Sequence, residues 1–175
     1  MNDIIKAMEE RRSIRKFKPD MPDKGALQQI IEAGLYAASG MGKQSAMVIA
    51  VTKKDLRDQI SEDNRRIGGW DEGFDPFYGA PAILIVLGNR EVPTHVYDGS
   101  LVMGNLMLAA HSFGLGSIWI HRAKEEFDQP RYQKLLKDLG IEGEWEGIGH
   151  CAVGYMDTDL PKAADRKAGR VCWVE

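Results

Sequence analysis

The strongest constraint on the fold is a long apolar helix predicted for residues 98–113. Apolar side chains recur on all sides of this segment and leave little polar face. A small domain cannot leave such a helix uncovered without exposing a large apolar patch. We therefore expect the helix to be buried. We also expect it to end at Gly114, because glycine readily adopts the left-handed backbone that closes a helix.

Around this helix, the sequence alternates between patterns typical of helices and of buried strands. Asp23 is a suitable N-cap for a helix whose core-facing stripe begins at Leu27. Further helices are predicted for residues 4–12, 54–66 and 130–139, and strands for residues 46–51, 82–87, 117–121, 147–155 and 170–174. This order predicts an α+β fold, in which one sheet carries helices on its faces.

Size and composition favour one domain spanning residues 1–175. The net charge of −3 argues against a nucleic-acid partner, because such proteins are more often basic overall. Cys151 and Cys172 lie far apart in the sequence, which fits a reducing cytoplasm better than a disulfide framework. The first residues lack the apolar core of a signal peptide, and no run approaches the ~20 apolar residues of a membrane span. We expect a cytoplasmic protein with no membrane partner.

A dense basic run, Arg11-Arg12-Ser13-Ile14-Arg15-Lys16-Phe17, follows the first predicted helix. Guanidinium groups bind phosphate oxygens two at a time, and a serine hydroxyl with nearby backbone N–H groups can complete such a site. The run therefore indicates a binding site for a small, compact anion. A merely solvated basic segment is the alternative, and the run alone does not decide between the two.

Two glycine-containing loops could border such a site. Residues 38–45 are small and polar, which lets the backbone approach a flat ligand or another chain closely, although a simple linker also fits. Residues 68–76 place aromatic side chains among glycines and acids. That composition fits either a mobile lid or an ordinary surface loop.

No set of side chains points to catalysis by the protein alone. The sequence contains no recognisable nucleophile triad, carboxylate dyad or metal-ligand spacing, so we assign no catalytic residue and no metal. His150 and Cys151 are interpreted as a buried structural pair.

Several landmarks together resemble the FMN-dependent nitroreductase family. They are, in order, Arg-Arg-Ser-Ile-Arg at 11–15, Ser-Gly-Met-Gly-Lys-Gln at 39–44, Ala80-Pro81 before a strand, Asn105 to Ala110, Gly114 to Ile120, Gly154-Tyr155 and Arg166-Lys167. Each motif is weak alone, but the ordered set covers nearly the whole chain. The resemblance implies a three-layer α/β/α sandwich with a central mixed sheet. It also implies a domain-entwined homodimer, and we expect the apolar helix to form its core.

The resemblance further implies an oxidoreductase in which FMN, bound at the subunit interface, carries the chemistry. NADH or NADPH would supply electrons to a small-molecule acceptor, such as a nitroaromatic or a quinone, by a ping-pong mechanism. A flavin-binding or regulatory dimer without substantial turnover is the alternative. A nucleic-acid binder that uses the basic run is disfavoured by the acidic balance of the chain.

Carried over by position, the cofactor-binding residues fall on four segments. Arg11, Arg12 and Ser13 would hold the phosphate, and Arg15 would lie at the pyrimidine edge of the flavin ring. Trp119, Ile120, His121 and Arg122 would pass the ring, where a backbone N–H faces the flavin N5. Ser39, Gly40 and Gly42 would lie against the ring bound in the partner subunit. Arg166, with Lys167 beside it, would reach back to the phosphate.

The chain departs from the family pattern in three places. Gly42-Lys43-Gln44-Ser45-Ala46 stands where Asn-x-Gln-Pro-Trp is usual, so an asparagine contact to the ring is lost. His121-Arg122 replaces a frequent double glycine, and Ala164-Asp165-Arg166 replaces Lys-x-Arg. The departures bear on the acceptor, which the sequence does not identify.

Overall fold

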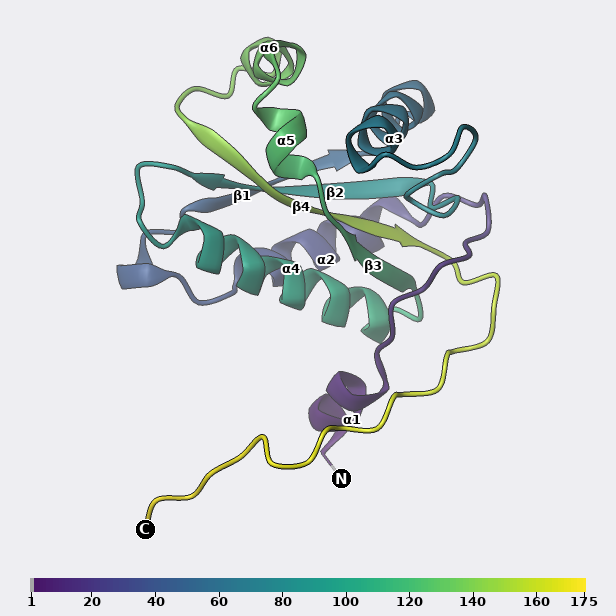
Figure 1. The fold of residues 1–175 in the computed structure, drawn as a ribbon, viewed down its shortest axis with the longest axis vertical. Helices are drawn as coiled ribbons and strands as arrows, with labels where there is room; N and C mark the ends of the chain where they lie inside the picture. Colours follow the sequence, from purple (N-terminus) through teal and green to yellow (C-terminus); the bar gives the residue numbers. More distant parts are fainter. Residues whose placement is uncertain (1) are drawn as a thin grey trace.

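The computed structural model describes residues 2–175 and shows a four-stranded sheet between two helical layers (Figure 1). The strands are β1 (Ala46–Val51), β2 (Ala82–Asn89), β3 (Gly116–Ile120) and β4 (Trp145–Gly154), in the order β1-β2-β4-β3. Neighbouring strands all pair antiparallel. Among residues 2–175, parallel pairing is confined to one isolated bridge between Ser13 and Ser117. The mixed character predicted for the sheet is therefore limited to that bridge.

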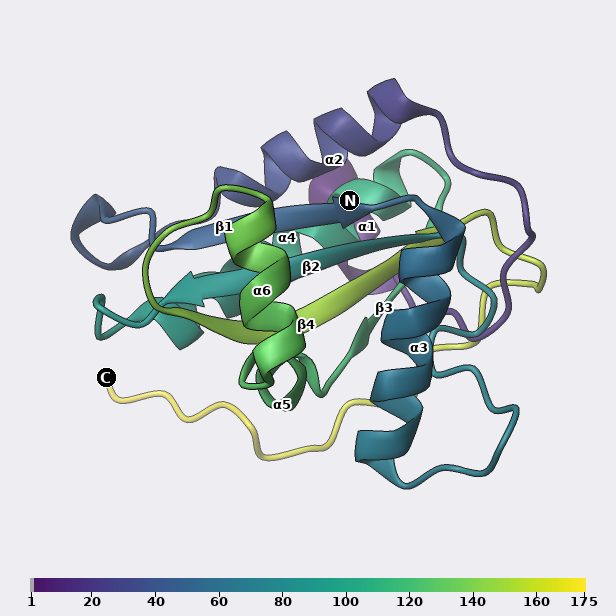
Figure 2. The ribbon, with the colours of Figure 1, turned by 90° about the horizontal axis from the view of Figure 1, so that it is seen from above.

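Helices cover both faces of the sheet (Figures 1 and 2). One face carries α2 (Lys24–Leu35) and α4 (His95–Ser112), with α1 (Asp3–Glu10) packed against α4 outside them; the other carries α3 (Lys54–Gly68), α5 (Ala123–Phe127) and α6 (Pro130–Asp138). This arrangement confirms the predicted α+β class and the three layers. Within residues 2–175, no helix combines the length and apolar character needed to cross a bilayer.

The central strand β2 separates two hydrophobic cores, because its side chains alternate between the two faces of the sheet. The core beneath α3, α5 and α6 contains Ile83, Ile85 and Leu87. The core beneath α2 and α4 contains Ala82, Leu84 and Val86. All six side chains are fully buried. Burial on both faces explains why the strand is an unbroken apolar run in the sequence.

The ends of the main elements follow local sequence signals. The Asp23 side chain accepts hydrogen bonds from the N–H groups of Gly25 and Ala26, so it is the N-cap of α2 as predicted. Gly114 has a φ of 71° and follows the end of α4, as predicted. The sequence patterns missed α5, because five residues are too few to show helical periodicity.

The apolar helix α4 is buried on one side only, so the expectation of complete burial is wrong for the single chain. Val102, Met103 and Leu106 are in the core, whereas Tyr97 and Leu101 on the other side are exposed. Gly34 of α2 sits where a β-carbon would clash with Leu106, which lets the two helices pack closely. The open side of α4 is apolar surface that the chain itself does not cover.

The strand predicted for residues 170–174 is absent from the described chain. Residues 157–175 instead form an exposed tail that leaves the folded body (Figure 1). Its apolar side chains Val171, Trp173 and Val174 are all exposed, with Trp173 82% accessible. The apolar pattern is real, but the tail pairs with no strand of its own chain.

Candidate functional site

The basic run lies along the outer edge of β3. The Ile14 N–H donates to the Ser117 carbonyl at 3.1 Å, and the Ile14 side chain is fully buried. Ser13 and Arg15 flank this anchor, and in an extended segment neighbouring side chains point to opposite sides. Burying Ile14 therefore turns Ser13 and Arg15 away from that part of the core. Arg11 forms the C-cap of α1 and begins the segment.

Two buried guanidinium nitrogens in this run have no partner among residues 2–175. They are Nη1 of Arg11 and Nε of Arg12. The only side-chain hydrogen bond of the pair runs from Arg12 Nη1 to the Arg11 carbonyl oxygen at 2.5 Å, and neither arginine forms an ion pair with an acid of the described chain. A buried donor without an acceptor is costly, so buried donors nearly always have partners. The two nitrogens therefore mark a position for an external acceptor.

The nearby thiol of Cys151 does not supply the missing negative charge. Burial raises the pKa of Cys151 to about 12, and the positive charge of Arg11 lowers it only partly. The thiol is consequently neutral near pH 7. Full burial of both His150 and Cys151 confirms their interpretation as a buried pair.

A second group of predicted residues follows at the end of β3. The Trp119 indole Nε1 is buried without a partner among residues 2–175, and the rings of Trp119 and His121 lie 5.8 Å apart. Trp119, His121 and Arg122 line a cavity of about 600 Å³, whose far wall includes Val96 and Ser100 of α4. Trp119 and His121 give this cavity an aromatic wall, which suits a flat ligand.

Arg122 has an unusual backbone at this point. Its φ is 82°, in the left-handed region that a non-glycine residue rarely adopts. The side chain turns outward to an ion pair with Glu125 at 2.9 Å. Glycine would adopt this conformation without strain, whereas an arginine would not, so the surrounding structure must hold Arg122 in place.

The predicted loop around Gly40 is anchored by a residue that the sequence did not single out. Asp98, buried at the start of α4, accepts hydrogen bonds from the Gly40 N–H at 2.9 Å and from the Ser45 hydroxyl at 2.5 Å. Burial alone would raise the pKa of Asp98, but these bonds and one from Thr94 hold the pKa below its usual value. An acid in the first turn of an apolar helix was the available signal.

Beyond that anchor, the loop is open to the outside. Met41 is 88% accessible, and Gly42, with a φ of 65°, has free space where a side chain would project. Ser39 and Gly42 line a cavity of about 730 Å³ together with Leu35, the last residue of α2, and Tyr36, its C-cap. Gly40 is different, because a β-carbon there would collide with Thr94. Close packing within the chain therefore requires the glycine at position 40.

The single chain does not gather all of the predicted cofactor-binding residues. The run at 11–15 and the segment 119–122 both lie along β3, whereas the loop at 39–42 precedes β1 at the opposite edge of the sheet. Arg166 lies in the exposed tail, where its guanidinium donates only to the Ala164 carbonyl oxygen, and Lys167 is exposed beside it. Among residues 2–175, no hydrogen bond or ion pair joins Arg166 to Arg11 or Ser13.

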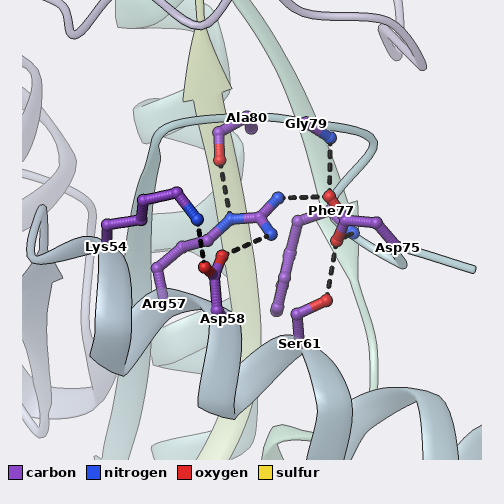
Figure 3. Close-up of polar contacts among 8 residues, drawn as sticks. All are labelled: Lys54, Arg57, Asp58, Ser61, Asp75, Phe77, Gly79 and Ala80. Carbon is purple, nitrogen blue, oxygen red and sulfur yellow. Dashed lines mark hydrogen bonds and ion pairs between the residues drawn. The ribbon is translucent and has the colours of Figure 1, made fainter. Parts of the chain in front are cut away.

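The loop at 68–76 is fastened at one end, which favours an ordinary ordered loop over a mobile lid (Figure 3). Asp75 accepts hydrogen bonds from Arg57 at 2.5 Å, from the Ser61 hydroxyl at 2.7 Å and from the Gly79 N–H at 2.8 Å. Burial raises the pKa of Asp75, but these bonds outweigh it and leave the pKa below its usual value. Arg57 also donates to the Ala80 carbonyl oxygen.

Comparison with known proteins gives one consistent result. The model of the Nitroreductase family matches residues 8–155. The chain is 28% identical over 126 residues to a putative NADH dehydrogenase/NAD(P)H nitroreductase of Methanothermobacter thermautotrophicus, covering 67% of this chain and 60% of that protein. It is 29% identical over 170 residues to an FMN reductase [NAD(P)H] of Bacillus subtilis, covering 81% of this chain and 66% of that protein. The matches thus span less than two thirds of the length of these two relatives.

A solved structure matches over the full length of both chains. It is a nitroreductase with bound FMN from Bacteroides fragilis, 28% identical in sequence, with a TM-score of 0.87 and 100% of each chain covered. The arrangement of strands and helices described above is therefore the arrangement of a known fold.

Proposed function

The chain belongs to the nitroreductase family, and we propose that it is a flavoenzyme that uses FMN and NADH or NADPH to reduce a small-molecule acceptor. Residues 1–175 would form one FMN-binding domain. The observation that carries the proposal is the pair of buried, unpartnered guanidinium nitrogens on Arg11 and Arg12. The B. subtilis relative, an FMN reductase [NAD(P)H], and the FMN-bound B. fragilis structure support the choice of cofactor.

The residues along β3 fit FMN in their donor chemistry. Arg11, Arg12 and the Ser13 hydroxyl would hold the phosphate, which accepts several charge-assisted hydrogen bonds at once. Trp119 and the backbone of residues 120–122 would border the flavin ring, and the aromatic rings of Trp119 and His121 line the cavity at that position. Arg15 would lie at the pyrimidine edge. Bound FMN would supply the hydride chemistry.

In this proposal the protein binds and orients, and no side chain makes or breaks a bond of the substrate. Arg15 would favour negative charge at the pyrimidine edge, because a fixed cation stabilises charge that develops nearby. The cavity beside Trp119 would admit the nicotinamide and the acceptor in turn, which is the ping-pong order. Nitroaromatics and quinones are the acceptors that we propose to test first.

We also propose that the active form is a domain-entwined homodimer. Three uncovered apolar surfaces support it: the outer side of α4 with Tyr97 and Leu101, the loop with Met41, and the tail with Trp173. Ser39, Gly40 and Gly42 of each protomer would then border the flavin of the other. The tail would pack on the dimer and bring Arg166 and Lys167 to a phosphate. The two unpaired cysteines support our assignment of the enzyme to the cytoplasm.

Absorbance and turnover test the proposal together. Purified protein should carry the flavin absorbance bands, or acquire them with added FMN, and should oxidise NADH or NADPH in the presence of a nitroaromatic or quinone. Protein that binds no FMN and whose melting temperature FMN leaves unchanged would contradict the proposal. Flavin binding without steady-state turnover would instead favour the alternative of a flavin-binding or regulatory dimer.

A further inference from the structure

Behind the segment 119–122 lies a buried polar network that the proposed function has not used. It consists of Asn64 on α3, Glu126 on α5 and His150 on β4, and all three residues are fully buried. Burying three polar side chains is unfavourable unless they are well paired. Their contacts therefore show what the network is built to hold.

Asn64 binds both the network and the backbone. Its amide nitrogen donates to the carbonyl oxygen of His121 and to the Glu126 carboxylate, both at 2.8 Å. Both acceptors are oxygens, so the amide orientation is fixed by its partners. Asn64 thereby ties the residue after β3 to helix α3, which is 57 positions away in the sequence.

Glu126 and His150 complete the network. The His150 Nε2 lies 2.7 Å from the Glu126 carboxylate, an ion-pair separation, although the alignment falls short of hydrogen-bond geometry. The other ring nitrogen of His150 lies 3.4 Å from the carbonyl oxygen of Ile120. Phe77 packs edge-on against the His150 ring at 5.3 Å and holds it from the other side.

The network therefore faces two consecutive carbonyl groups, those of Ile120 and His121. The peptide bonds of residues 2–175 are all trans, so each carbonyl points opposite to the N–H of the next residue. The N–H groups of His121 and Arg122 consequently point away from the network. Arg122, the next residue in the chain, has a left-handed backbone conformation, and such a conformation needs contacts with the surrounding structure to hold it.

We propose that Asn64, Glu126 and His150 are positioning residues, which hold the backbone N–H groups of His121 and Arg122 toward the flavin ring. The inference rests on the proposed function, because it takes FMN as the ligand beside this segment. The three side chains do not touch the ligand. They act through the two peptide groups whose carbonyl oxygens, those of Ile120 and His121, face the network.

The adjacent residue Asp63 supplies a matched control on the same helix. It is also buried, and it accepts hydrogen bonds from the Tyr132 hydroxyl at 2.8 Å and from Arg131 at 2.6 Å. These bonds join α3 to α6 and leave residues 120–122 untouched. Asp63→Asn should therefore weaken packing on the same helix without moving the backbone beside the flavin.

The test compares Asn64→Ala with Asp63→Asn in the full chain, by FMN titration and by amide NMR of the flavin-free protein. Asn64→Ala should weaken FMN binding about fivefold, the effect of one hydrogen bond, and should shift the His121 and Arg122 amide resonances. Asp63→Asn should change FMN affinity less than twofold and leave those resonances in place.

Equal effects of Asn64→Ala and Asp63→Asn on FMN affinity, or unmoved His121 and Arg122 resonances in Asn64→Ala, would overturn the inference. If Asn64→Ala does not fold, the inference is tested on the wild-type protein instead. On FMN addition, the amides of His121 and Arg122 must then be among the most strongly shifted, and their invariance would also overturn the inference. Failure of the proposed function is separate, because it appears as wild-type protein that binds no FMN.

Discussion

The two faces of the sheet differ in how their arginine side chains are partnered. On the face of α3 and α5, Arg57 donates a hydrogen bond to Asp75. On the same face, Asn64 donates hydrogen bonds to Glu126 and to the His121 carbonyl oxygen. At the outer edge of β3, beside the face of α2 and α4, buried nitrogens of Arg11 and Arg12 have no partner among residues 2–175. Apolar side chains such as Tyr97 and Met41 are exposed as well.

This difference predicts which mutations should change folding stability and which should change ligand binding. Polar groups that pair within the chain contribute to folding, whereas donors left unpaired contribute only when a ligand or a second chain arrives. A pair on the face of α3 and α5 (the paired face) that does not contact the segment 119–122, such as Arg57 with Asp75, should therefore be sensitive to mutation in unfolding experiments and insensitive in FMN titrations. The unpartnered donors of Arg11 and Arg12 should show the reverse.

The largest effect is expected on the paired face, from Arg57→Met. Loss of this buried guanidinium removes the cation that pairs with Asp75 and the side-chain donor to the Ala80 carbonyl oxygen. The free energy of unfolding should fall by about 3–4 kcal/mol, measured by urea denaturation. Arg66→Met, which removes an exposed ion pair with Glu62 on the same helix, should change it by less than about 0.5 kcal/mol. Equal losses of unfolding free energy in the two variants would contradict the expected difference between buried and surface ion pairs.

Arg11→Ala should show the opposite behaviour. FMN affinity should fall about 30-fold, which corresponds to about 2 kcal/mol for a charged hydrogen bond. The flavin-free protein should be no less stable, because the variant removes an unpartnered buried donor. Lys6→Ala removes an exposed charge from the neighbouring helix and serves as the control for net charge. Unchanged FMN affinity in Arg11→Ala would refute the phosphate role.

Asp98 lies on the open face but is itself paired, so its contribution should depend on pH. Its pKa is lowered in the folded state, so its stabilising effect is present above the unfolded pKa near 4 and is lost as pH falls through the folded pKa. Asp98→Asn should reduce the free energy of unfolding at pH 7 by about 1–2 kcal/mol. The gap to wild type should narrow on acidification below about pH 4. A gap that stays constant down to pH 3 would show that the charge is not involved.

The smallest effect concerns a single hydroxyl group. Ser13→Ala should weaken FMN binding about fivefold, or about 1 kcal/mol, without changing the melting temperature of the flavin-free protein. Ser112→Ala, at the far end of α4, removes a hydroxyl that bonds only to the Ala109 carbonyl oxygen and controls for the loss of any serine. If both variants bind FMN as wild type does, Ser13 does not contact the phosphate.

Much of this fold could be predicted from local patterns. The strand at 46–51 has its predicted bounds, and Asp23 caps α2, because alternation and capping are properties of a few consecutive residues. The terminal strand was predicted wrongly, because residues 170–174 have a strand pattern but no pairing edge within their own chain. Pattern alone does not show which chain provides the neighbour.

The residue types of the candidate site could be predicted from the sequence, whereas their arrangement in space was less predictable. The arginines of the basic run lie together because they are consecutive, whereas Arg166 lies in the exposed tail and, among residues 2–175, forms no hydrogen bond or ion pair with them. Asn64 and Asp98 were missed because each acts on a backbone more than 50 positions away in sequence, at distances of 57 and 58 residues. Polar residues inside helical patterns give no local sign of such a partner.

The most direct test of the phosphate assignment is a titration of flavin-free protein with FMN and with riboflavin, which differ only by the phosphate group. If Arg11, Arg12 and Ser13 bind the phosphate, FMN should bind at least ~100-fold more tightly than riboflavin, the effect of two charge-assisted hydrogen bonds. The preference should fall about 30-fold in Arg11→Ala. Equal affinity of the wild-type protein for the two flavins would contradict the assignment.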